Sequence, residues 1–87
     1  MSYDEDPVEE ILAYLRAQGS AALHGGRQMA VESITTVLTL VDREMDLLVK
    51  CRNGLWRARE TSKVANVEQL EGILKAVKVI VETLRGK

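Results

Sequence analysis

The feature that most constrains the fold of this chain is a series of apolar residues that recur at alternating intervals of three and four positions. Six residues form the series: Val31, Ile34, Leu38, Val41, Met45 and Leu48. This spacing is the heptad pattern of helices that pack against other helices, as in coiled coils. It predicts one long central helix over residues 27–52, which reaches residue 62 if the next segment continues it. The dipeptide Asn53–Gly54 favours left-handed backbone conformations and predicts a break or kink there.

Apolar side chains on the predicted central helix extend well beyond this stripe. With about 100° of rotation per residue, Val37, Leu40 and Leu47 fall on one flank and Val49 on the other. The apolar arc then covers roughly 200°, about twice the width expected of a surface helix. The other helices can cover only part of this arc, so we predict a homodimeric helical bundle, with a heteromeric partner as the alternative. The predicted interface residues are Val31, Ile34, Val37, Leu38, Leu40, Val41, Met45, Leu47 and Leu48.

Two further helices are predicted from local start and stop signals. Asp6 followed by Pro7 favours a helix start, and the apolar spacing that follows predicts a helix over residues 7–18. Asn66 and Gln69 have the spacing of a capping box, which predicts a helix over residues 67–85. Residues 1–6 form an acidic, flexible N-terminus in this prediction, and residues 7–87 form a single domain. The fold class is all-α: a helical hairpin or three-helix chain with one long central helix, completed into a bundle by dimerisation.

Composition excludes several classes of protein. Of the 87 residues, 46% are hydrophobic and 29% are charged, which is typical of a folded chain rather than a disordered one. The longest uncharged stretch of the apolar centre, residues 33–41, has nine residues, less than half of a membrane span. One cysteine, Cys51, and the lack of an apolar leader point to the reducing cytoplasm. We therefore expect a cytoplasmic protein without membrane-spanning segments.

The net charge of −1 conceals an uneven distribution of charge along the chain. Residues 4–10 are acidic, whereas residues 50–63 are mostly basic and contain the one tryptophan. Basic residues interleaved with an aromatic one are typical of anion-binding surfaces. Two other interpretations are that these cations complement a helix dipole, or that acidic residues 4–10 dock on them, within a copy or across the dimer. The candidate anion-binding residues are Lys50, Arg52, Trp56, Arg57, Arg59 and Lys63.

No catalytic, metal-binding or cofactor-binding motif stands out in the sequence. His24 precedes two glycines and is predicted to lie in a surface loop, and Cys51 is expected to pack as a small hydrophobic residue. Glu44 and Arg52 fall within the apolar arc, where they either set the register of the bundle or reach its rim. We predict a non-enzymatic helical protein–protein interaction module, such as an adaptor, chaperone or regulatory subunit, without cofactor. The alternative is a small dimeric regulator that binds nucleic acid or another polyanion through residues 50–63.

Overall fold

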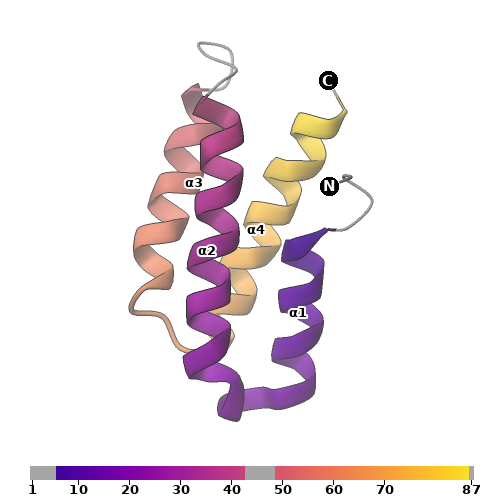
Figure 1. Cartoon of the computed structure of the whole chain (residues 1–87), viewed down its shortest axis with the longest axis vertical. Coiled ribbons are helices and arrows are strands. Elements are labelled where there is room, and N and C mark those ends of the chain that lie inside the picture. Colours follow the sequence, from indigo (N-terminus) through magenta and orange to yellow (C-terminus); the bar gives the residue numbers. More distant parts are fainter. Residues whose placement is uncertain (1–5, 43–48, 87) are drawn as a thin grey trace.

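Helices account for almost all of the residues that the computed structural model describes, 6–42 and 49–86 (Figure 1). In chain order these are α1 (Pro7–Gln18), the 3-10 helix η1 (Gly19–Ala22), α2 (Leu23–Asp42), α3 (Val49–Ser62) and α4 (Val67–Arg85). Helix α2 packs against both α1 and α3, and α4 contacts all three of these helices. The result is a compact all-α globule that measures 39 × 26 × 17 Å.

Helix α1 has the bounds that the local signals predict. The side chain of Asp6 accepts hydrogen bonds from the backbone N–H groups of Val8 (3.1 Å) and Glu9 (3.4 Å), which would otherwise lack partners in the first turn. The helix ends at Gly19, whose φ of 59° is readily accessible to glycine. The chain stays helical through η1 and enters α2 without an extended segment.

The prediction of one continuous helix over residues 27–52 is wrong. Helices α2 and α3 lie side by side as antiparallel neighbours (Figure 1), and α2 ends at Asp42. The predicted break at Asn53–Gly54 is also wrong, because both residues lie inside α3. Gly54 is half-buried, and a Cβ atom there would lie 3.5 Å from the Cδ1 atom of Ile80 in α4. Packing against α4 therefore outweighs the local preference of this dipeptide.

The hydrophobic core lies between the four α-helices of the described chain and contains residues from each of them. The largest fully buried apolar side chains are Val8, Leu12 and Leu15 of α1, Ile34 of α2, Leu55 of α3, and Leu70, Leu74 and Val77 of α4. The guanidinium of Arg27 donates a 2.8 Å hydrogen bond to the carbonyl oxygen of Ala65, which ties α2 to the connection between α3 and α4. One chain thus encloses a core by itself.

The predicted start of the last helix is confirmed. The backbone N–H of Asn66 donates to the Gln69 side chain, and the backbone N–H of Gln69 donates to the Asn66 side chain, each at 2.9 Å. This capping box fixes where α4 begins. Within the residues described, no helix is both long enough and apolar enough to cross a membrane.

Candidate interaction groove between α2 and α3

The residues predicted to form a dimer interface are divided by the fold. Ile34, Val37, Leu38 and Val41 are buried within the chain, with at most 9% of their surface exposed. Val31 is half-buried and Leu40 is 39% exposed. The remaining three, Met45, Leu47 and Leu48, lie outside the described residues.

The wide apolar arc of α2 is covered on two sides by helices of the same chain. Gly26 of α2 approaches Leu15 of α1 so closely that a Cβ atom would lie 2.7 Å from the Leu15 Cδ2 atom. On the other flank, α3 packs along α2. The expectation that this arc needs a second copy rested on a continuous central helix. With α3 folded back, much of that apolar surface is already removed from water.

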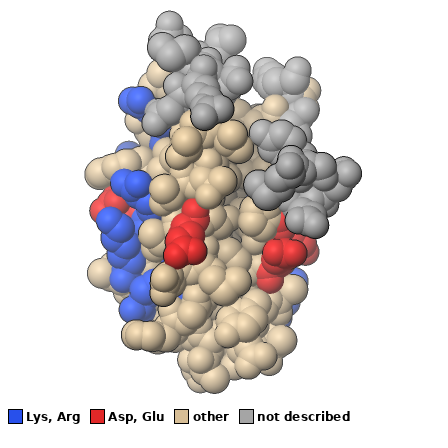
Figure 2. Space-filling view, viewed as in Figure 1, with Lys and Arg blue, Asp and Glu red and all other residues tan. Residues whose placement is uncertain are grey.

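The basic residues of α3 do not share one face of the helix. Arg52, Trp56, Arg59 and Lys63 follow one another at intervals of four, three and four positions, so they lie along one side. Arg57 is five positions after Arg52, which places it roughly 140° away around the helix. Lys50 lies seven positions before Arg57 and therefore shares its side. Figure 2 shows lysine and arginine side chains along the edge of the molecule that α3 forms.

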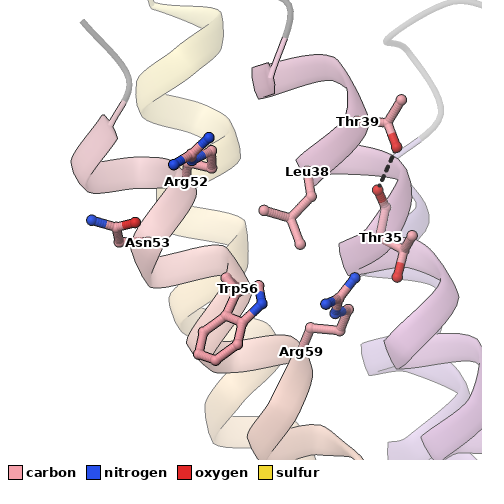
Figure 3. Close-up of a pocket in the computed structure, with 7 residues that line it drawn as sticks. All are labelled: Thr35, Leu38, Thr39, Arg52, Asn53, Trp56 and Arg59. Carbon is pink, nitrogen blue, oxygen red and sulfur yellow. Dashed lines mark hydrogen bonds between the residues drawn. The ribbon is translucent and has the colours of Figure 1, made fainter. Parts of the chain in front are cut away.

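A groove of about 480 Å³ runs between α2 and α3 beside the first of these stripes. Figure 3 shows the side chain of Leu38 pointing from α2 toward α3, and the guanidinium of Arg59 pointing from α3 toward α2. Trp56 is 54% exposed, which is unusual for so large an apolar side chain. The lining residues are Thr35, Leu38 and Thr39 from α2, and Arg52, Asn53, Trp56 and Arg59 from α3.

Hydrogen bonds within α2 occupy the threonine hydroxyls of the groove. Thr35 donates to the carbonyl oxygen of Val31 at 2.7 Å, and Thr39 donates to that of Thr35 at 3.0 Å. Threonine hydroxyls within a helix commonly donate to the carbonyl of the preceding turn in this way. The two threonines therefore offer oxygen acceptors and methyl groups to a ligand, while the two arginines offer N–H donors.

Two of the predicted cations share one carboxylate. Glu60 accepts a hydrogen bond from Arg59 Nε (3.2 Å) and forms an ion pair with Arg59 Nη2 (3.1 Å), and its other oxygen accepts from Lys63 Nζ (3.2 Å). The hydrogen bond from Lys63, together with the charges of both cations, holds the pKa of Glu60 below its usual value. Glu60 therefore offsets part of the positive charge on this side of α3.

Glu9, in the acidic start of the chain, lies against α4 rather than against α3. Glu9 forms an ion pair with Lys78 of α4, and Asp6 caps α1. The hydrogen bond from Lys78 lowers the pKa of Glu9, and the same bond raises the pKa of Lys78. The hypothesis that residues 4–10 dock on the basic segment of the same copy is thus wrong for Glu9, and docking across a dimer stays a prediction. Asp4 and Glu5 lie outside the described residues.

The structure also gives the positions of three other residues singled out in the sequence: His24, Cys51 and Arg52. His24 is exposed in the first turn of α2, so its prediction as a loop residue is wrong. Cys51 is half-buried in α3, and Arg52 is exposed at the groove. Glu44 lies outside the described residues. The part of the chain that the structure describes holds no group of three or more His, Cys, Asp or Glu side chains placed to bind a metal ion.

Sequence reasoning missed the α2 side of the groove. Leu38 is predicted as an apolar interface residue, but Thr35 and Thr39 give no signal on their own, because their role depends on α3 lying antiparallel to α2. The heptad pattern shows that α2 packs against another helix, but it does not identify the neighbour.

Compared with known proteins, the chain matches no family model, no curated protein and no solved structure.

Proposed function

We propose that this chain is a non-enzymatic helical module that binds a protein partner through the groove between α2 and α3. One observation carries the proposal: Trp56, 54% exposed, lies between Arg52 and Arg59 at the edge of a groove. Tryptophan and arginine are among the residues most enriched at the positions that dominate binding energy at protein interfaces. An adaptor, a chaperone or a regulatory subunit would present such a surface.

A site-specific crosslink tests this proposal. A photoreactive phenylalanine analogue replaces Trp56 in one variant and Arg57 in a second variant, and both are irradiated in native host cells. Arg57 is the matched control because it is exposed on the same helix but lies on a different side. We expect a discrete protein adduct from position 56 that position 57 does not give. Equal adducts from both positions, or none from position 56, would contradict the proposal.

The second candidate is a regulator that binds nucleic acid or another polyanion through α3. The basic edge in Figure 2 favours it, because several cations on one helix raise the local concentration of anions. Binding of this kind weakens steeply as salt rises. Fluorescence of Trp56 during titration with an oligonucleotide, at low and at high salt, tests this candidate. An unchanged signal at low salt would reject it.

The compartment that fits this proposal is the cytoplasm. Cys51 is the one cysteine of the chain, so the fold is stabilised without an intramolecular disulfide. The packed core described above supplies that stability instead.

A further inference from the structure

We propose that the groove binds an acidic helix of the partner protein, with carboxylates at Arg52 and Arg59 and an apolar side chain against Trp56. This inference rests on the proposed function for the existence of a protein partner. It adds the chemistry by which that partner is recognised.

Among the described residues that line the groove, two are arginines and none is acidic, and Glu60 beside Arg59 offsets part of their charge. Arginine presents five N–H donors in a planar fork, more than one carboxylate occupies, so an arginine that already has a partner in its own chain can still donate to a ligand carboxylate. Glu60 accepts a hydrogen bond from Nε of Arg59 and forms an ion pair with its Nη2, and the fork of Arg59 has further donors for a second carboxylate. The groove therefore complements a negatively charged ligand.

The spacing of the arginines matches that of a helix. Arg52 and Arg59 are seven positions apart on α3, which corresponds to about 10.5 Å along the helix axis. Carboxylates seven positions apart on a second helix are separated by the same distance. Trp56 lies between the two arginines, and Leu38 faces it across the groove (Figure 3). An apolar residue between the two carboxylates of the ligand would pack there.

The hydrogen bonding favours a protein ligand over a nucleic acid. A nucleic-acid backbone is bound through several phosphate contacts, each to a cation or another N–H or O–H donor. The hydroxyls of Thr35 and Thr39 already donate to α2, and Lys50 and Arg57 lie on another side of α3. Two arginines around an exposed indole suit one pair of carboxylates with an apolar side chain between them.

A designed peptide tests the inference. The probe is a helical peptide of about 15 residues without tryptophan, with Glu at positions i and i+7 and Leu at i+4. Its matched control has Gln in place of Glu. Because Trp56 is the one tryptophan of the chain, its fluorescence reports binding at the groove directly. We expect saturable binding of the Glu peptide and at least about tenfold weaker binding of the Gln peptide.

Two variants of the protein locate the binding site. Arg52→Gln should weaken binding of the Glu peptide by at least about tenfold, the loss of a charge-assisted hydrogen bond. Arg57→Gln removes the same charge from another side of α3 and should change binding by less than about twofold. Both residues are exposed, so neither substitution disturbs the core. Circular dichroism confirms that each variant keeps its helices.

Four outcomes would overturn the inference. The first two are equal losses of binding from Arg52→Gln and Arg57→Gln, and equal binding of the Glu and Gln peptides. The other two are no binding up to about 1 mM peptide, and tighter binding of oligothymidylate than of the Glu peptide. A protein crosslinked at position 56 together with any of these outcomes would retain the proposed function and reject the acidic helix. The two proposals can therefore fail separately.

Discussion

Gly26 shows how strongly one residue can limit the distance between two helices. A Cβ atom at this position would lie 2.7 Å from Leu15 Cδ2, and Leu15 is only 1% exposed, so its side chain has little room to move. Gly72 in α4 provides the contrast, because a Cβ atom there would meet nothing within 4 Å. The two glycines occupy helices for different reasons, although the sequence does not distinguish them.

The first prediction follows from this contrast. Gly72→Ala should stabilise the protein by about 0.5–1 kcal/mol, because alanine favours the helical backbone. Gly26→Ala gains the same preference but must displace a buried leucine, and we expect a net loss of about 1–2 kcal/mol. Urea denaturation followed by circular dichroism measures both free energies of unfolding. If both substitutions stabilised the protein, the close contact between α1 and α2 would be wrong.

The second prediction concerns the ion pair between Glu9 and Lys78. The hydrogen bond from Lys78 lowers the pKa of Glu9 in the folded state, so the pair stabilises the protein at a pH above the unfolded value near 4.5. This stabilisation is lost as the pH falls through the lower folded pKa. Lys78 has a raised pKa, so its contribution is present below 10.5 and is lost as the pH rises through the folded value.

Glu9→Gln should therefore lower the free energy of unfolding slightly at neutral pH, and the difference from the parent protein should vanish at about pH 2. Glu10→Gln is the control, because Glu10 lies in the same first turn of α1 and feels the same helix dipole. Denaturation of the three proteins at both pH values measures the effect. An equal loss from both substitutions at neutral pH would assign the effect to the dipole rather than to Lys78.

At the scale of the helix, the parts that could be predicted are those with local signals. Helices α1 and α4 begin at polar caps whose partners lie within three residues, so sequence alone locates them. The central region could not be predicted in this way. Its apolar stripe packs against α3 of the same chain. Asn53–Gly54 remains helical within α3, where Gly54 packs against α4. The groove could not be predicted either, because it depends on how α2 and α3 are placed relative to each other.

The third prediction tests the capping box of α4. Asn66→Ala removes the side chain that accepts from the Gln69 backbone N–H, and we expect a loss of about 1 kcal/mol in the free energy of unfolding. Asn66→Asp keeps an acceptor at the same position and should be close to the parent protein. Thermal and urea denaturation of both variants measure the difference. Equal losses from both variants would show that the side-chain acceptor is not what stabilises this helix start.

At the scale of the whole molecule, homodimerisation remains a proposal. The apolar surface of α2 that is available for it is smaller than the arc predicted from the sequence. Met29 and Leu40 are exposed on α2 (41% and 39%). Leu40 follows Leu38 by two positions, about 200° around the helix, so it lies on a different side from the groove. A dimer through this side would leave the groove open to a partner. We therefore expect self-association and partner binding to be independent.

The fourth prediction tests self-association through the side of α2 that contains Leu40. Sedimentation of the parent protein should give a mass above 9.7 kDa at high concentration. Leu40→Glu should restore the monomer mass without loss of helix content, because Leu40 is outside the buried core. Val64→Glu is the control, since Val64 is 80% exposed and lies outside α2. A mass of 9.7 kDa for the parent protein at every concentration would reject the homodimer.

The contact between α1 and α4 also affects how the chain folds. Helices α2 and α3 are neighbours in sequence and can pair early, whereas Glu9 and Lys78 are 69 positions apart. Bringing distant segments together costs chain entropy that rises with the logarithm of the loop length. Once the middle helices have paired, the open chain between α1 and α4 is effectively shorter. The ordering of the central hairpin should therefore lower the entropic barrier to docking the two terminal helices.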